Sequence, residues 1–74
     1  MEIVKYSTSF DGIGIQRPVK WLLNNLDRGT VELFENERII RINSPISKMY
    51  SVCNEKEWRV VMEKLNQCNL DWRN

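Results

Sequence analysis

Histidine and alanine are both absent from this chain of 74 residues. Without histidine, the chain lacks the side chain whose pKa lies nearest neutral pH and the commonest metal ligand. Neither cysteine has an imidazole to activate it as a nucleophile, and two cysteines supply half of the four ligands that a structural zinc site needs. We therefore expect no catalytic residue, no metal site and no cofactor, and the chain is predicted not to be an enzyme.

Cysteine itself is scarce. Cys53 and Cys68 are too few for the disulfide framework that a small secreted domain normally carries. The helix predicted between them would hold their Cα atoms roughly 20 Å apart, which is beyond the reach of a disulfide. Both residues are expected to be small apolar members of the core. This cysteine usage favours a reducing, cytoplasmic setting.

The chain also lacks a large net charge and any long apolar run. Eleven Lys and Arg nearly balance ten Asp and Glu, so the net charge is +1, and no bulk field attracts nucleic acid or an anionic membrane. No stretch approaches the roughly 18 apolar residues of a membrane span, and the N-terminus has no basic segment followed by an apolar one. We expect a single domain over residues 1–74, with no membrane contact.

The N-terminal half contains β and helical patterns in succession. Residues 2–10 are rich in β-branched and aromatic types, which predicts a strand. Asp11-Gly12 is a strong hairpin signal, and it would pair this strand with a short return strand that ends before Pro18. Pro18 and Gly29 suit the first position and the C-cap of a helix. Apolar residues at i, i+3, i+4 and i+7 between them predict an amphipathic helix.

Residues 30–43 predict a second hairpin with Asn36-Glu37 at its turn. In that register Val, Leu and Ile side chains share one face of the sheet, and a Glu faces an Arg on the other. Phe34 and Ile39 fall on this second face. They need a further cover, and a partner could provide it.

The C-terminal half predicts one more strand and a long helix. Residues 47–53 have strand character, and Asn54 with Glu57 three residues later forms a capping box. Apolar residues then recur at helical spacing as far as Trp72. The apolar face consists of Trp58, Val61, Met62, Leu65, Cys68 and Trp72.

The order of these elements predicts an α+β fold. It is an antiparallel sheet of three to five strands backed on one face by two helices, in the order β(β)-α-β-β-β-α.

Apolar side chains off the predicted core carry the functional hypothesis. Trp21 falls about 160–200° from the centre of the apolar stripe of its helix, beside Asn25 and Arg28. Val60 lies on the polar side of the last helix. Since Trp is enriched at binding hot spots and chemistry is excluded, recognition of another protein is the main hypothesis. The expected contact surface consists of Trp21, Phe34, Ile39 and Val60, with Arg38 and Arg41 at its rim.

Such a module would act as an inhibitor or adaptor of the kind that phages and mobile elements direct against host nucleases or defence complexes. Eight Asn, seven Ile and no Ala are typical of an AT-rich genome. Two alternatives stay open for the apolar groups. The N-terminal segment could fold over Trp21, or the groups could close a homodimer, since a core this small is often supplemented by a partner chain.

The alternative function is nucleic-acid binding. The order helix, three strands, helix from Pro18 to Gln67 is similar to that of a double-stranded-RNA-binding domain, which grips phosphates through lysines at the start of its last helix. Those positions here read Asn54-Glu55-Lys56-Glu57, and two carboxylates there would repel a phosphate. A basic strip with an aromatic could instead hold a single strand. That strip consists of Arg38, Arg41, Lys48 and Tyr50.

Overall fold

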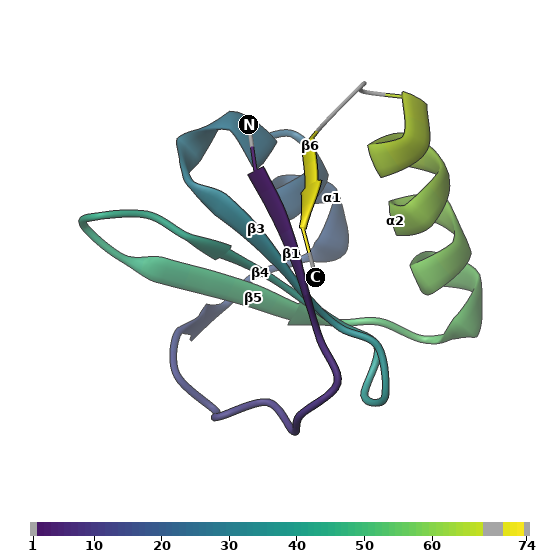
Figure 1. Cartoon of the computed structure of the whole chain (residues 1–74), viewed down its shortest axis with the longest axis horizontal. Coiled ribbons are helices and arrows are strands. Elements are labelled where there is room, and N and C mark those ends of the chain that lie inside the picture. The colour runs from purple at the N-terminus through teal and green to yellow at the C-terminus, as the bar shows by residue number, and fades with distance from the viewer. Residues whose placement is uncertain (1, 68–70, 74) are drawn as a thin grey trace.

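The structure is a computed structural model that describes residues 2–67 and the backbone of residues 71–73. In chain order its elements are β1 (Glu2–Tyr6), β2 (Ile15–Gln16), α1 (Val19–Leu23), the 3-10 helix η1 (Leu26–Arg28), β3 (Thr30–Phe34), β4 (Ile39–Asn43), β5 (Lys48–Val52), α2 (Glu55–Gln67) and β6 (Asp71–Arg73). The strands form one sheet in the order β2-β5-β4-β3-β1-β6, and α1 and α2 pack together on one face of it (Figure 1).

The fold is α+β, as the pattern of elements predicts, but the sheet is mixed rather than antiparallel. The pairs β3–β4 and β4–β5 are antiparallel, whereas β1 runs parallel to both β3 and β6, and β2 runs parallel to β5. Parallel neighbours require a connection that crosses the sheet. The chain provides one between β1 and β3, because it passes to the far edge, adds β2 and returns through α1.

The predicted first hairpin at Asp11-Gly12 is wrong. Residues 7–14 instead cross the sheet from β1 to β2, and three strands lie between these two. The Asp11 carboxylate accepts hydrogen bonds from the Ile13 N–H at 2.8 Å and from Arg41 at 2.6 Å. A buried arginine on β4 therefore holds this segment over the sheet, and this tertiary bond overrides the local turn signal.

The predicted helix from Pro18 to Gly29 is shorter than expected. It consists of α1, an interruption at residues 24–25, and the single turn η1. Gly29 is not a left-handed C-cap, because its φ of −172° is ordinary extended backbone. A Cβ at Gly29 would lie 2.3 Å from the carbonyl oxygen of Asn43. Glycine is therefore required there by the close approach of the end of β4.

The predicted register of the second hairpin is confirmed. The Cα partners of β3 and β4 are Val31 with Ile42, Glu32 with Arg41, Leu33 with Ile40 and Phe34 with Ile39. The strand ladder ends one pair before the predicted turn Asn36-Glu37, at Phe34 with Ile39. Within the turn the Arg38 N–H donates to the Glu35 carbonyl at 3.3 Å, and Arg38 adopts a left-handed φ of 54°. Residues 35–38 form the turn, and β5 follows within the predicted range.

Helix α2 begins as predicted and ends earlier. The Asn54 side chain accepts from the Glu57 N–H at 2.7 Å, and the Glu57 carboxylate accepts from the Asn54 N–H at 2.9 Å, which confirms the capping box. The helix ends at Gln67, and Trp72 lies in β6 beside β1 (Figure 1). Strand pairing at the open edge of β1 satisfies backbone groups that a longer helix would leave unpaired. Cys68 lies outside the described residues.

The core lies between the sheet and the two helices. Ile3, Leu33, Ile40 and Ile42 from the sheet are fully buried there. The apolar stripe of α2 supplies Val61 and Leu65, and α1 and η1 supply Leu22 and Leu26. The opposite face of the sheet is covered by residues 7–14.

Candidate functional site

Arg41 lies at the centre of the sheet face that residues 7–14 cover. Its side chain is buried, with 4% of the residue exposed, and Glu32 beside it is 5% exposed. The guanidinium donates from Nε to Glu32 Oε1 at 2.6 Å, and from Nη1 to Asp11 Oδ1 at 2.6 Å and the Ile13 carbonyl at 3.1 Å. The expectation that Arg41 lies at the rim of a contact surface is wrong, because its donors are used inside the chain.

Phe34 and Ile39 are also buried, so the expectation that they belong to a partner-contact surface is wrong. The ring of Tyr6 stacks on Phe34 with centroids 5.0 Å apart, and Phe10 meets Phe34 edge-on at 5.1 Å. The Arg41 guanidinium lies 5.2 Å from the centroids of Phe10 and Phe34. The cover that Phe34 and Ile39 require therefore comes from the N-terminal segment of the same chain.

Hydrogen bonding keeps the charges of this cluster fixed near neutral pH. The bond from Arg41 and that from the Ile13 N–H hold the pKa of Asp11 below its usual range. Burial alone would lower the pKa of Arg41, but its bonds to Asp11 and Glu32 outweigh burial and raise it. Burial raises the pKa of Tyr6, and its hydroxyl, which donates to Glu32 at 3.0 Å, adds to that rise. These pKa shifts keep Asp11 and Arg41 charged and Tyr6 neutral near neutral pH.

The expected nucleic-acid strip is not assembled as a strip. Arg38 lies in the 35–38 turn, whereas Lys48 pairs with Asn43 at the other end of β4, about 16 Å away at about 3.3 Å per residue. Arg41 and Tyr50 are neighbours across β4 and β5, but the Tyr50 ring packs against Phe10 with centroids 4.8 Å apart. The two central members of the strip are thus occupied by intramolecular contacts.

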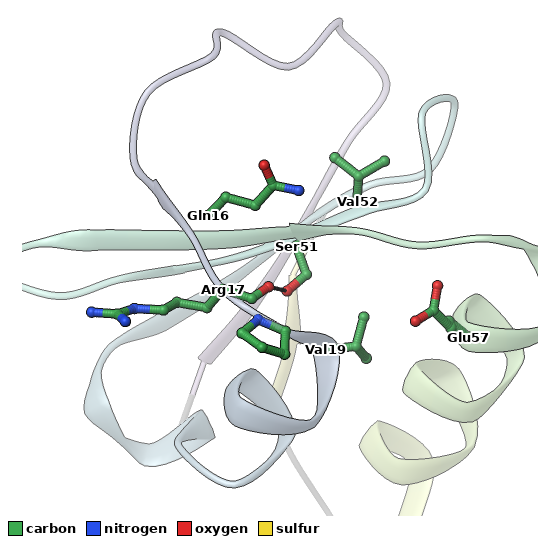
Figure 2. A pocket seen from close by; sticks show the side chains of 7 residues that line it. Gln16, Arg17, Val19, Ser51, Val52 and Glu57 are labelled. Atoms are coloured by element: carbon green, nitrogen blue, oxygen red, sulfur yellow. Dashed lines mark hydrogen bonds between the residues drawn. The ribbon is translucent and has the colours of Figure 1, made fainter.

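Trp21 keeps part of its ring in contact with solvent. It packs against the core from α1, so it is half-buried rather than directed away from the core. The guanidiniums of Arg17 and Arg28 each lie 5.5 Å from its ring centroid. Arg28 Nε also donates to Asn25 Oδ1 at 2.7 Å. The N-terminal segment does not fold over this helix, since it crosses the opposite face of the sheet (Figure 2).

A pocket of about 450 Å³ adjoins Arg28. Its lining is Arg28, Ser44, Pro45, Ile46, Ser47 and Met49. Ile46 is 96% exposed. Ile15 on β2, which pairs with Met49 on β5, is half exposed. We call Arg17, Trp21, Arg28 and Ile46, with the pocket that Ile46 lines, the Trp21 surface. The helical wheel identified Trp21 and placed Arg28 beside it, which the structure confirms. Arg17 and Ile46 were missed, because the sheet, and not the local sequence, brings residue 17 and the 44–47 turn to this surface.

The charge of the Trp21 surface is unbalanced. Among the described residues, neither Arg17 nor Arg28 forms an ion pair. No acidic side chain lines the adjoining pocket. Two cations on the face of one indole therefore remain available to an anionic group. Val60, half exposed on α2, is outside this surface.

A second pocket, of about 370 Å³, lies where β2 ends beside β5. It is lined by Gln16, Arg17, Pro18, Val19, Ser51, Val52 and Glu57. Figure 2 shows Gln16 and Val52 on one side of β5 and Ser51, Val19 and Glu57 on the other. The Ser51 hydroxyl donates to the Arg17 carbonyl. No sequence signal indicates this pocket, because it depends on β2 lying parallel to β5.

Cys53 is buried, as expected. Burial raises its pKa to about 11, and the nearby Glu57 charge adds to that rise. The thiol is therefore protonated near neutral pH, and the thiolate is the reactive form.

Comparison of the chain with protein-family models, with curated proteins and with solved structures finds no match. Within residues 2–67, no three side chains of metal-ligating type gather in one place. None of the helices in this part of the chain has the length and apolar character needed to cross a membrane.

Proposed function

We propose that this protein is a small non-enzymatic module that binds another protein through the Trp21 surface. The observation that carries the proposal is the pair Arg17 and Arg28, each 5.5 Å from the centroid of the half-buried Trp21 ring and neither in an ion pair among the described residues. Trp and Arg are the residue types most enriched at binding hot spots.

The arrangement holds both arginines ready for a ligand. A guanidinium over an indole face is attracted by the ring quadrupole, and Arg28 is further held by Asn25. Less side-chain entropy is then lost on binding, because the donors are already ordered. A guanidinium binds a carboxylate through two parallel hydrogen bonds. Each arginine can therefore hold one acidic side chain of the partner.

The partner segment is acidic and carries a large apolar side chain. Charge complementarity argues for the acidic residues, since the surface presents Arg17 and Arg28. The pocket beside Arg28 argues for the apolar residue, since Ile46 is almost fully exposed and Met49 lies at its floor. Burying such a side chain against them is favourable by about 25 cal/mol per Å² of apolar surface.

Within this proposal the module acts in the cytoplasm as an inhibitor or adaptor of the phage or mobile-element kind, directed at a host nuclease or defence complex. The buried, protonated thiol of Cys53 supports a setting that does not require disulfides. The high content of Asn and Ile supports a source with an AT-rich genome.

A displayed library of random 12-residue peptides tests the proposal. Selection on the native protein should enrich sequences with two or more acidic residues and one large apolar residue, and these peptides should bind Trp21→Ala much more weakly. Arg28→Gln should weaken the enriched peptides about tenfold, the loss of one charge-assisted bond. Lys56→Gln is the matched control, a lysine of α2 outside this surface, and it should leave binding unchanged.

Other outcomes would overturn the proposal. Peptides without acidic residues, or equal binding to Trp21→Ala, would show that the surface is wrong. Tighter binding of a 20-nucleotide single strand or an RNA duplex than of any selected peptide, with a steep salt dependence, would replace the proposal with the nucleic-acid function. If the mass of the protein doubled at high concentration and the spectroscopic signals of Trp21 shifted at the same time, the occupant of the Trp21 surface would be a second copy of the chain.

A further inference from the structure

The outer edge of β5 is incompletely paired, and its register shows which groups are open. The Cys53 N–H donates to the Arg38 carbonyl at 2.8 Å, one residue beyond the Val52–Ile39 pair of the ladder. Val52 is thus in a non-hydrogen-bonded pair with β4. In an antiparallel ladder the N–H and C=O of one residue point to the same side, and successive residues alternate. The N–H and C=O of Val52 therefore point away from β4, toward the pocket beside the end of β2.

Strand β2 stops one residue too early to satisfy these groups. It pairs with β5 through Ile15 and Gln16, and the Arg17 N–H donates to the Tyr50 carbonyl at 2.8 Å. Pro18 follows, and the chain turns into α1. The Arg17 carbonyl, the next acceptor along β2, is taken by the Ser51 hydroxyl instead. No backbone bond joins Val52 to residues 17–19 in the structure.

Val52 thus offers three things at this pocket: a backbone N–H donor, a backbone C=O acceptor and a β-branched side chain. Val52 is 52% exposed, and the Gln16 side chain lies on the same side of β5 as that of Val52 (Figure 2). We propose that this pocket binds an extended segment of a partner protein, which adds to β5 at Val52 as a short strand where β2 leaves off.

An extended polypeptide matches this site better than a second copy of the chain. Strand addition supplies one acceptor for the Val52 N–H and one donor for its carbonyl at strand spacing. A two-fold pairing of two β5 edges centred on Val52 would need the edge at Tyr50 as well, and β2 already occupies it. This site goes beyond the Trp21 surface, because it uses backbone hydrogen bonds rather than arginines. Only Arg17 contributes to both, with its backbone here and its side chain there.

Backbone amide spectra of the ¹⁵N-labelled protein test the proposal with a defined probe. The probe is a five-residue peptide of alternating threonine and valine with blocked ends. We expect binding in the millimolar range, with the Val52 amide moving downfield and the strongest shifts at Val52 and Gln16. The same peptide carrying N-methyl groups on its amides should not bind, because it cannot donate.

Variants separate the backbone bond from the side chain. Val52→Pro removes the donor without removing a sheet bond, because that N–H faces the open edge, and it should weaken the peptide about fivefold, the worth of one hydrogen bond. Val52→Thr keeps the N–H and should bind as the native protein does. Lys48→Pro is the matched proline control on the same strand, away from the pocket, and should also retain binding.

Three results would overturn the proposal: no shift at Val52, equal binding of the N-methylated peptide, or shifts at Val52 that appear with rising protein concentration and a doubled mass in the absence of peptide. The comparison of the two peptides uses the native protein, so it decides the matter even if Val52→Pro does not fold. Arg28→Gln should leave this titration unchanged, so failure here and failure of the Trp21 surface are distinguishable.

Discussion

The face of the sheet under α1 and α2 is lined by apolar side chains, whereas the face crossed by residues 7–14 holds a buried arginine between two carboxylates. Leu33 and Ile40 represent the first face, and both are fully buried. Arg41 and Glu32 represent the second, with a charge pair 2.6 Å apart under Phe10. Apolar burial is sufficient on the first face, whereas on the second each buried charge requires its partner.

This difference shows how so small a chain covers both faces of its sheet. Two short helices provide enough apolar surface for one face. The other is closed by an eight-residue loop, which cannot bury a broad apolar area and is instead held by directed bonds. Asn36 donates to the Ser7 carbonyl at 3.0 Å, and the Phe10 N–H donates to Glu37. The loop is therefore attached at named points that substitutions can remove one at a time.

The largest effect is expected at the charge pair. Arg41→Ala leaves Glu32 buried without its partner and should lower the free energy of unfolding by about 3–5 kcal/mol. The double variant Glu32→Leu with Arg41→Met replaces the pair by apolar groups and should lose far less. Urea unfolding followed by circular dichroism measures both. A double variant as unstable as Arg41→Ala would show that the charges themselves stabilise this face.

A truncation on the helix face should cost slightly less. Leu33→Ala removes a fully buried side chain under the helices, and we expect a loss of about 3 kcal/mol from lost burial and the remaining cavity. The same urea titration, repeated at pH 7 and pH 4, should give the same loss at both values. A loss that depends on pH would mean that the two faces are coupled.

Removal of the loop's anchor should have a smaller effect. Phe10→Ala leaves the ion pairs intact but uncovers Arg41 and the edge of Phe34. Because the Phe10 side chain is partly exposed already, we expect about 2 kcal/mol, below the usual cost of a fully buried Phe. Amide exchange should accelerate in residues 7–14 and remain slow in β3. Unchanged exchange in the loop would show that Phe10 does not hold it.

Low pH should destabilise the sheet face crossed by residues 7–14 and not the face under α1 and α2. This is the smallest of the four expected effects. The folded-state pKa of Asp11 is lowered, so its contribution is present above the unfolded pKa of about 4 and is lost as pH falls through the lower folded value. Asp11→Asn should therefore flatten the fall in stability below about pH 4. Urea midpoints between pH 2 and pH 6 measure it, and a native-like slope in this variant would assign the acid sensitivity to another carboxylate.

The success of the sequence predictions followed the range of the contacts involved. The β3–β4 register, the α2 capping box and the burial of Cys53 were all correct, since alternation and caps depend on residues close in sequence. The Asp11-Gly12 hairpin was wrong for the opposite reason. Its turn signal is strong, but Asp11 is bound by Arg41, 30 residues away.

The candidate sites followed the same rule. Trp21 and its neighbour Arg28 could be identified from their positions on the helical wheel, whereas Arg17 and Ile46 could not, because they reach this surface through the sheet. Phe34 and Ile39 could be assigned to the second face, whereas the segment that buries them could not. The pocket at Val52 requires knowing that β2 pairs with β5, and two residues of strand leave almost no periodic signal.

The amino-acid pattern by itself determined the α+β class, the central hairpin and the stripe of α2, because these depend on periodicity within a few turns or one ladder. The tertiary structure decided where β1, β2 and β6 join the sheet, which face the N-terminal segment covers and which side chains stay exposed. Those outcomes depend on bonds between distant residues, Arg41 with Asp11 above all. Such bonds form only once the fold has brought their two partners together.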